Sequence, residues 1–385
     1  MSIPRILIIA GSDSGGGAGI QADIKTVTML GAHAMTAITA ITAQNTLGVS
    51  AVHAVPTEIV IAQVDAVLED IGADAVKIGM IGSPETAEAL AGRLARLEGI
   101  PIVFDPVMVA TSGSELADEA TVAAFGKLMD VSTIVTPNLP ELAELSWGDD
   151  PVHAALKLVS DHRCAVLIKG GHDKGEALVD ALIEEDNMTS WQSSRLATPH
   201  THGTGCTMAS AIAVYLAQGA PLPTAVDRAR LFVRLALRGA PGLGKGNGPM
   251  GQGTVRLDAG EGPRLNHITL PCSDYEASLD FYRSIGLRLI VDSPPDYARF
   301  EAPGGATLSL QASDDAPSNS TVYFECDDLD EEVQRLSQMG LGFDQGPTNQ
   351  PWLWREARLR DPSGNVICLY RAGEGRRFPP WRVKG

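Results

Sequence analysis

Apolar and polar positions divide the chain into regions of different pattern. Within residues 5–240, short apolar runs of strand length alternate with longer amphipathic stretches whose apolar positions recur at helical spacing. The apolar runs are Ile6–Ala10, Ala75–Ile78, Ile102–Phe104, Thr133–Val135 and Val166–Ile168, and the amphipathic stretches include Thr57–Ile71, Pro84–Leu97 and Pro151–His162. This alternation predicts an α/β fold in which a mostly parallel sheet is flanked by helices on both faces.

Polar motifs with glycine or proline follow these apolar runs directly. They are Gly11–Gly19, Gly79-Met80, Asp105-Pro106-Val107, Thr136-Pro137-Asn138 and Lys169-Gly170-Gly171. In an open parallel sheet, ligands bind beyond the carboxyl ends of the strands, so we expect the motifs to line one site. The first motif matches neither a dinucleotide fingerprint nor a lysine-bearing P-loop.

The pattern changes twice after residue 240. Residues 241–263 are rich in glycine, and we expect a ligand-facing loop followed by an interdomain linker. Beyond them an internal repeat is visible at an offset of 54 residues, where Asp274 matches Asp328 and Gly286-Leu287 matches Gly340-Leu341. Each half reads as a strand, a helix and further strands, and the two halves must pair to bury a core. We therefore expect a first domain over 1–250, a linker over 251–263, an α+β domain of two βαβββ halves over 264–372, and a tail over 373–385.

Composition narrows the possible partners and location. The formal net charge of −17 disfavours nucleic acid and anionic membranes as partners. The five cysteines are scattered, which suggests neither a disulfide framework nor a structural zinc site. The N-terminus reads as a first strand rather than a secretory signal, and no apolar run is long enough to span a membrane. We expect a cytoplasmic protein that forms a homodimer.

The stretch Ala197–Thr207 places two glycines and a cysteine just before a segment that reads as a helix. Gly203 and Gly205 let the backbone turn sharply and direct successive N–H groups at one point, and a helix over Thr207–Ala217 would add its positive end. The segment therefore predicts either an anion-binding turn or a simple helix N-cap. In the first case Cys206 should ionise more easily than a free thiol.

Two further motifs suggest chemistry at the strand ends. Asn138 and Glu141, three residues apart after a strand, suit a water-rich magnesium site beside phosphate, with Asp105 as an additional carboxylate. Glu141 could instead pair with a helix dipole. Asp23 follows the glycine-rich first motif and opens or lines the next helix; the alternative for it is a solvated carboxylate at that helix start. Lys169 would supply a cation at the end of another strand.

Taken together and in this order, the motifs resemble those of the hydroxymethylpyrimidine/phosphomethylpyrimidine kinases of thiamine biosynthesis, members of the ribokinase-like superfamily. The residues that carry the resemblance are Ala10–Asp23, Gln44-Asn45-Thr46, Lys77–Met80, Asp105–Val107, Thr136–Asn138, Lys169–Gly171 and His202–Cys206. It covers roughly residues 4–250. It implies two ATP-dependent phosphorylations in one pocket, first of 4-amino-5-hydroxymethyl-2-methylpyrimidine and then of its monophosphate.

The resemblance also implies roles for individual residues. Cys206 would activate the accepting hydroxyl, and the backbone of Gly203, Thr204 and Gly205 would hold the transferring phosphoryl group. Gln44 would bind the aminopyrimidine edge, because an amide matches its donor and acceptor. The remaining roles are pocket lining for Gly11, Asp23, Met80 and Val107, nucleotide binding for Lys169, Gly170, Lys245 and Gly246, and Mg²⁺ binding, partly through water, for Glu141, Asn138 and Asp105.

Two points stay open for this first domain. A pyridoxal or pyridoxine kinase is the alternative, because relatives with the same cysteine-type anion hole take those alcohols. His202 precedes the anion hole and could touch phosphate, but a lone histidine in a loop, like His200, is more often structural.

The second domain resembles the glyoxalase/bleomycin-resistance (vicinal oxygen chelate) family. The resemblance rests on Leu265–Leu270, Phe281–Leu287 and Asp361–Tyr370. Members that use a metal draw one ligand from each of four positions, which here are His267, Thr321, Ser309 (or Gln311) and Cys368. Only His267 is a good ligand, so we expect a metal-free binding or regulatory cup. The alternatives are a metal-dependent lyase or dioxygenase, or a module that only mediates dimerisation.

Overall fold

The central strand β1 (Arg5–Asp13) shows why the first part of the chain folds as it does. In the computed structural model, Ile6 and Ile8 point to one face of the sheet, where they pack on α1 (Gly19–Met29), α7 (Thr204–Ala217) and α8 (Leu222–Arg238). Leu7 and Ile9 point to the other face and pack on α2 (Thr57–Asp70) and α3 (Pro84–Leu94). A strand buried on both faces needs a continuous apolar run, which is the pattern seen in the sequence.

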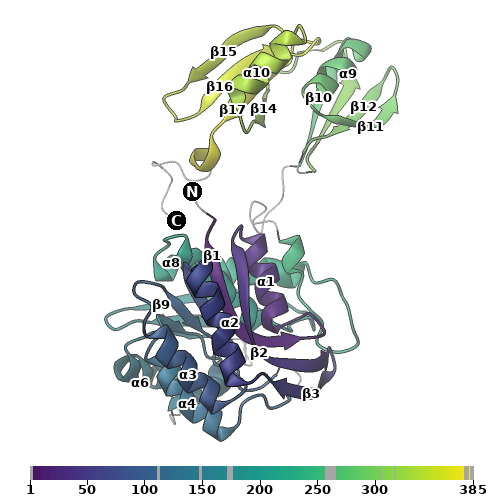
Figure 1. The fold of residues 1–385 in the computed structure, drawn as a ribbon. Helices are drawn as coiled ribbons and strands as arrows, with labels where there is room; N and C mark the ends of the chain where they lie inside the picture. Colours follow the sequence, from purple (N-terminus) through teal and green to yellow (C-terminus); the bar gives the residue numbers. More distant parts are fainter. Residues whose placement is uncertain are drawn as a thin grey trace. The chain divides into compact units, whose positions relative to one another are not determined.

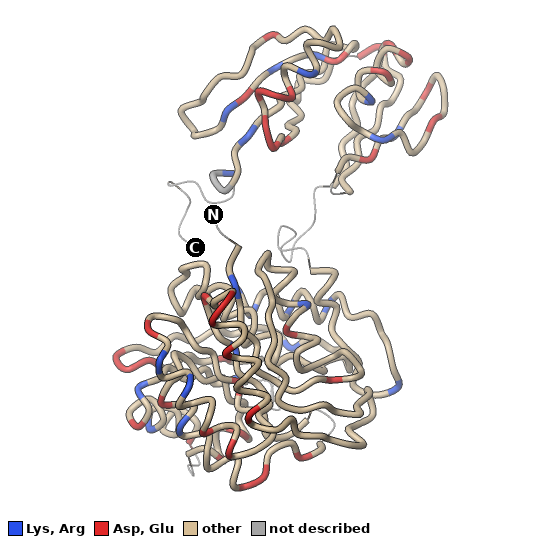
Figure 2. Tube along the Cα trace, in the orientation of Figure 1, with Lys and Arg blue, Asp and Glu red and all other residues tan. Residues whose placement is uncertain are grey.

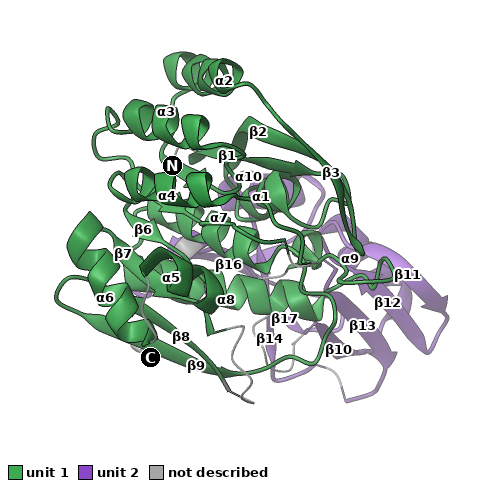
Figure 3. Cartoon of the chain, turned by 90° about the horizontal axis from the view of Figure 1, so that it is seen from below, with its two compact units in different colours: residues 1–261 green, residues 262–385 purple. Residues whose placement is uncertain are grey.

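The structure describes residues 3–110, 113–146, 150–170, 177–255, 266–303, 305–315, 317–376 and 381. Its contacts divide the chain into two units, residues 1–261 and 262–385 (Figure 3). Among the described residues, no helix is long and apolar enough to cross a membrane.

The described part of the first unit contains a nine-stranded sheet in the order β3-β2-β1-β4-β5-β6-β7-β8-β9 (Figure 1). The other strands are β2 (His33–Asn45), β3 (Gly48–Ala54), β4 (Ala75–Ile78), β5 (Ile102–Phe104), β6 (Ile134–Val135), β7 (Ala165–Ile168), β8 (Ala177–Ile183) and β9 (Met188–Ser194). The run from β2 to β7 is parallel, whereas β3, β8 and β9 pair antiparallel. The mostly parallel α/β prediction is confirmed, and its five predicted strands are β1, β4, β5, β6 and β7.

Helices cover both faces of this sheet, as predicted. Besides those above, they are α4 (Glu119–Met129), α5 (Leu139–Ser146) and α6 (Pro151–His162). Ser83, Asp118 and Asp150 cap α3, α4 and α6 by accepting a backbone N–H with their side chains. Ion pairs link neighbouring helices: Arg93 on α3 pairs with Asp65 on α2, and Lys127 on α4 pairs with Glu88 on α3. Figure 2 colours the acidic and basic positions of the chain.

The second unit repeats one βαβββ pattern. Its first half is β10 (His267–Cys272), α9 (Tyr275–Ser284), β11 (Arg288–Ser293), β12 (Tyr297–Glu301) and β13 (Thr307–Ala312). The second half is β14 (Thr321–Glu325), α10 (Leu329–Gln338), β15 (Phe343–Asn349), β16 (Arg355–Arg360) and β17 (Val366–Arg371). Both sheets have the same strand order, and residues from both halves form one core, as the repeat predicts.

The internal repeat is visible in the local structure. Asp274 and Asp328 each cap the helix of their half, and Gly286 and Gly340 each end it with a positive φ of 89° and 92°. Later in each half the sequence offset between corresponding residues is larger than 54. Ser309 and Cys368 show this, because each is the third residue of the last strand of its half.

A fully buried ion pair lies at the centre of the first unit. Lys77 on β4 and Asp23 on α1 are both solvent-inaccessible, and Lys77 Nζ lies 2.8 Å from Asp23 Oδ2. The Ser210 hydroxyl on α7 donates to the other carboxylate oxygen at 2.8 Å. Burial raises the pKa of Asp23 against the opposing effect of Lys77, so the carboxylate depends on that ammonium group.

We predict that Lys77→Met lowers the free energy of unfolding by roughly 3–5 kcal/mol, because it leaves the Asp23 carboxylate buried without its cationic partner. The double variant Lys77→Met/Asp23→Leu should recover part of that loss, since it removes both charges. Denaturant unfolding of the full chain measures both changes. A single variant as stable as the unsubstituted protein would contradict the prediction.

Candidate active site

A cavity of about 960 Å³ opens at the carboxyl ends of the parallel strands. Most of the predicted site residues line it together, although they are spread over more than 190 positions of the chain. They are Gly11, Gln44, Met80 and Val107, then Asp105, Asn138, Glu141 and Lys169, and finally Gly203, Thr204, Gly205 and Cys206.

The N-terminus of α7 points into this cavity. Gly203 has a φ of 87°, and α7 begins at Thr204 rather than at the predicted Thr207. A Cβ on Gly203 would overlap the carbonyl oxygen of Gly17, so only glycine allows the loop after β1 to lie this close. Because α7 starts early, the N–H groups of Gly205 and Cys206 belong to its first turn, where N–H groups have no acceptor within the helix. This arrangement suits an anion.

Asp105 and Lys169 meet the same helix end. Lys169 Nζ lies 2.7 Å from Asp105 Oδ1, which also accepts the Thr136 hydroxyl at 2.9 Å. A Cβ on Gly205 would lie only 3.2 Å from Asp105 Oδ2 and 3.3 Å from Lys169 Nζ, so glycine keeps the charged pair near the backbone. Burial disfavours the charged form of Asp105, but Lys169 and Lys77 outweigh it and the pKa of Asp105 is lowered.

The prediction that Cys206 ionises easily is wrong for the ligand-free protein. Burial raises the pKa of the Cys206 thiol to about 12, with Asp23 and Asp105 adding to the rise and Lys77 opposing it. The backbone N–H of Gly19, the first residue of α1, also favours the thiolate, so two helix N-termini meet at this sulfur. At neutral pH the group is nevertheless a thiol.

Asn138 and Glu141 first serve the helix α5 that they begin. The Asn138 N–H donates to Glu141 Oε2 at 2.8 Å, and the Glu141 N–H donates to Asn138 Oδ1 at 2.9 Å, which is a reciprocal capping box. Burial raises the pKa of Glu141 to about 7; Lys169 opposes the rise and the Asp105 charge adds to it. The sequence suggested dipole pairing or a magnesium site, and it missed the capping box itself.

The donor set fits a magnesium ion held through water better than one held directly. The carboxyl of Glu141 accepts backbone N–H groups but keeps lone pairs for water, and its raised pKa marks a place where negative charge lacks compensation. Within the described ranges, no three His, Cys, Asp or Glu side chains are grouped closely enough to hold a metal by themselves.

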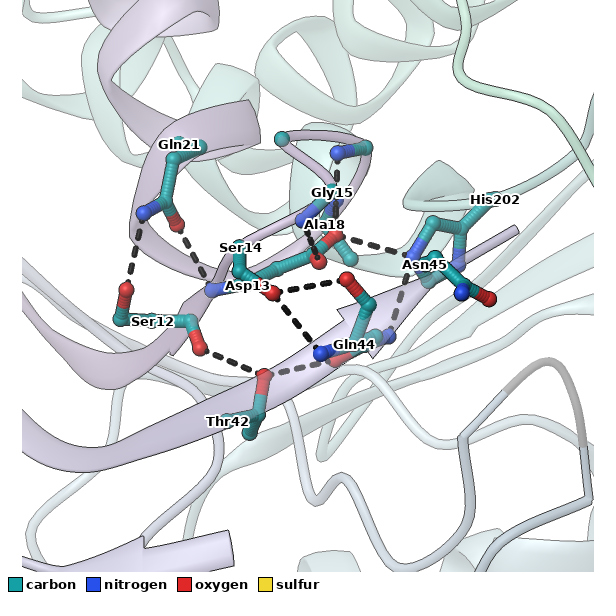
Figure 4. Close-up of polar contacts among 12 residues, drawn as sticks. Ser12, Asp13, Ser14, Gly15, Ala18, Gln21, Thr42, Gln44, Asn45 and His202 are labelled. Carbon is teal, nitrogen blue, oxygen red and sulfur yellow. Dashed lines mark hydrogen bonds and ion pairs between the residues drawn. The ribbon is translucent and has the colours of Figure 1, made fainter. Parts of the chain in front are cut away.

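Elsewhere in the cavity wall the structure adds two residues, Asp13 and His202, to the predicted amide of Gln44. His202 Nε2 lies 3.0 Å from Asp13 Oδ2 and 3.1 Å from the side-chain amide of Gln44 (Figure 4). Asp13 also accepts backbone N–H groups from Gly15, Gly17 and Ala18. The sequence offered one signal for Asp13, its place after the first strand in a glycine-rich loop, but nothing that joined it to a histidine 189 residues away.

Four predicted residues do not line this cavity. Asp23 is neither in the wall nor solvated at a helix start, because it is the fully buried partner of Lys77. Gly170 packs against the backbone of Val179 and donates its N–H to Asp180. Lys245 and Gly246, predicted to face the nucleotide, instead direct their N–H groups at the Thr46 hydroxyl at 3.2 and 3.3 Å.

In the second unit, His267 is exposed and is occupied by neighbouring hydroxyl groups. Its Nδ1 lies 2.8 Å from Thr307 Oγ1 and its Nε2 3.2 Å from Thr269 Oγ1. Ser309 is buried against the hydroxyl of Tyr297 at 2.6 Å, and Cys368 is buried on β17. Gly171 and most of the tail after Arg376 lie outside the described residues, as does the linker from 256 to 265.

Comparison with known proteins agrees with this geometry. Residues 13–251 match the family model described as phosphomethylpyrimidine kinase, and residues 264–369 match that of the glyoxalase/bleomycin resistance protein/dioxygenase superfamily. A hydroxymethylpyrimidine/phosphomethylpyrimidine kinase of Rhizobium meliloti is 47% identical over 253 residues, 63% of this chain and 95% of that protein. The thiamine biosynthesis bifunctional protein ThiED of Geobacter sulfurreducens is 46% identical over 254 residues, 64% of this chain, and the match spans only 51% of that relative.

Among solved structures, an ADP complex of Bacillus subtilis pyridoxal kinase is similar, with a TM-score of 0.60 and 34% identity over 65% of this chain and 97% of that one. The predicted ribokinase-like and glyoxalase-like resemblances are thus confirmed. Because the first family model spans well over half of the sequence, the chain belongs to the phosphomethylpyrimidine kinase family.

Proposed function

We propose that the first unit phosphorylates 4-amino-5-hydroxymethyl-2-methylpyrimidine with ATP and then phosphorylates the monophosphate to the diphosphate. The observation that carries this proposal is the single cavity that joins the Gln44 amide to the N-terminus of α7. The amide suits an aminopyrimidine edge, and the helix N-terminus suits the phosphoryl group. The names of the kinase relatives support this choice of substrate.

Phosphoryl transfer depends mainly on positioning and on neutralising charge. The N–H groups of Gly205 and Cys206 would bind the transferring group, and Lys169 would neutralise part of its charge from the same side. Glu141 and Asn138, with Asp105 nearby, would hold Mg²⁺ through water. A bound magnesium ion would neutralise phosphate oxygens.

Cys206 would accept the proton of the attacking hydroxyl. Its raised pKa means that only a small thiolate fraction is present at neutral pH, but that fraction is a strong base. The second step differs, because a phosphate monoester has a pKa of about 6 and is already anionic at pH 7. Its oxygen needs no base, so Cys206 should matter mainly for the first step.

We predict that Cys206→Ala lowers kcat/KM for the pyrimidine alcohol by about 100-fold or more, and lowers it much less for the monophosphate. For the unsubstituted protein, the rate with the alcohol should rise about tenfold per pH unit between pH 7 and 9, because the thiolate fraction rises in that proportion well below a pKa of about 12. Steady-state kinetics with each acceptor test both points. Equal losses for the two acceptors, or a rate independent of pH, would contradict the role of Cys206 as base.

For Gln44, we predict that Gln44→Ala raises the KM of the pyrimidine about tenfold while the KM of ATP stays nearly unchanged, because one amide contact with the ring is lost. Asn45→Ala is the matched control, since the neighbouring amide only accepts the N–H groups of Leu47 and Gly48 in the β2–β3 turn. If both KM values rise together, Gln44 supports folding rather than the substrate.

A pyridoxal or pyridoxine kinase is the second candidate, and the likeness to the Bacillus subtilis enzyme favours it. A direct comparison of the two alcohols under ATP and magnesium decides between them. A higher kcat/KM for pyridoxal than for the aminopyrimidine would overturn our choice.

For the second unit we propose a binding or regulatory cup that works without a metal. This is supported by the residues at the four family ligand positions. Both nitrogens of His267 lie near threonine hydroxyls, and Thr321 and Ser309 offer hydroxyls. Burial raises the pKa of the Cys368 thiol to about 12, which disfavours the thiolate that a metal binds.

We predict that the full chain, purified without chelators, holds less than about 0.1 equivalent of iron, manganese, zinc or nickel, because one imidazole alone binds these ions weakly. Elemental analysis measures the content, and His267→Ala is the control for adventitious binding. A stoichiometric metal lost in His267→Ala would favour the lyase or dioxygenase alternative.

A further inference from the structure

The side chains around Gln44 hold its amide at both ends. One end lies 3.1 Å from His202 Nε2, and the other lies 3.1 Å from Thr42 Oγ1 (Figure 4). Because the two ends of an amide have nearly the same shape, the donors and acceptors around it decide which end is the oxygen.

The state of Asp13 decides the role of His202. The Asp13 carboxylate accepts backbone N–H groups from Gly15 at 2.7 Å, Gly17 at 2.9 Å and Ala18 at 2.8 Å. Burial alone would raise its pKa, but the hydrogen bonds from His202 and this backbone outweigh it, and the pKa of Asp13 is lowered. Asp13 is therefore ionised at neutral pH.

A ring nitrogen 3.0 Å from an ionised carboxylate oxygen must carry a proton, since two lone pairs at that distance repel each other. His202 Nε2 is therefore a donor in both the neutral and the charged ring. In Figure 4 the amide nitrogen of Gln44 faces this Nε2, which sets two donors against each other. Turning the amide over places its oxygen against this N–H, whose single proton is then shared between the Gln44 oxygen and Asp13 Oδ2 in a three-centre hydrogen bond.

The opposite end of the amide agrees with the turned orientation. The Thr42 hydroxyl donates its single proton to the carbonyl oxygen of Ser12 at 2.8 Å. Its oxygen is then free to accept an N–H from Gln44. In the turned orientation each contact in the chain Asp13–His202–Gln44–Thr42–Ser12 joins a donor to an acceptor, with the His202 proton shared between Asp13 and Gln44.

We propose that His202, held by Asp13, fixes the polarity of the Gln44 amide, with its oxygen toward His202 and its nitrogen toward Thr42. The inference rests on the proposed function, in which Gln44 contacts the pyrimidine edge. One lone pair and one N–H of the amide are left for the ring, in a fixed order. A 4-aminopyrimidine offers an N–H beside a ring-nitrogen acceptor, whereas the 4-oxo analogue offers an acceptor beside an N–H, which is the reverse order.

His202 is therefore a positioning residue that selects the amino ring over the oxo ring. Its place in the fold suits this task. The side chain is 9% exposed, and a Cβ on Gly17 would lie 2.5 Å from its ring carbon Cδ2, so the imidazole is confined by the loop after β1. The backbone N–H of His202 donates to the carbonyl oxygen of Gly248 at 3.2 Å.

The test compares the phosphorylation of 4-amino- and 4-oxo-5-hydroxymethyl-2-methylpyrimidine. In His202→Leu, the preference for the amino ring in kcat/KM should fall about tenfold, mainly through the KM of the pyrimidines, with the KM of ATP unchanged. His202→Gln keeps an N–H donor within similar reach and should restore most of the preference. Ser14→Ala is the matched control, because Ser14 bonds the backbone of Gln44 and not its amide, so the preference should persist.

The outcomes separate this inference from the proposed function. If the unsubstituted protein fails to phosphorylate the aminopyrimidine alcohol, the proposed function is wrong. If it succeeds and His202→Leu keeps the full preference, the inference is wrong. Should His202→Leu fail to fold, ¹⁵N NMR of the unsubstituted protein still decides: a protonated Nε2 on His202 supports the inference, and a lone pair there overturns it.

Discussion

The site depends on the close approach of two backbone segments, the loop after β1 and the turn before α7. A side chain at Gly203 would overlap the carbonyl oxygen of Gly17, and one at Gly17 would overlap the imidazole of His202. The contact brings the N-terminal turns of α1 and α7 to one point beside Cys206. Two helix N-termini directed at one place create a positive potential that no side-chain cation has to supply. The rest of the cavity is arranged around that potential.

Charges near this point are balanced in pairs, and the balance explains the resting state of the thiol. Lys77 pairs with Asp23 and Lys169 pairs with Asp105, so the two ammonium groups are already committed to carboxylates. Lys77 still favours a thiolate at Cys206, but burial and the Asp23 and Asp105 charges outweigh it and keep the group protonated. Burial raises the pKa of Glu141 to about 7, which marks a side of the cavity where additional positive charge is stabilising.

Local sequence patterns predicted the sheet and most of the site, and they failed where an interaction joins distant segments. The apolar runs of β1, β4, β5, β6 and β7 are largely buried and were visible as runs, whereas β2, β3 and β9, which alternate with or consist of exposed positions, were not. The mostly buried strand β8 was missed as well, because the buried Asp180 interrupts its apolar run. Gly203–Cys206 could be predicted because backbone geometry is encoded locally. Asp23 was misplaced because its partner Lys77 lies 54 residues away, and the capping-box role of Glu141 was missed although its motif is local.

A strand irregularity places the amide that distinguishes this cavity from a generic phosphate site. The pairing of β2 with β3 shifts register between Ala43 and Gln44, and the pairing of β1 with β2 shifts between Ala10 and Ser12. Bulges of this kind turn a side chain away from its regular direction and recur beside active sites. Here both shifts lie at the same end of neighbouring strands, so Ser12 and Gln44 meet across Thr42. The Gln44 amide is therefore placed by two local distortions of the sheet, whereas the N–H groups of Gly205 and Cys206 are placed by the start of α7. The two sets of groups are joined by His202, which contacts Gln44 and directly precedes Gly203 at the start of α7.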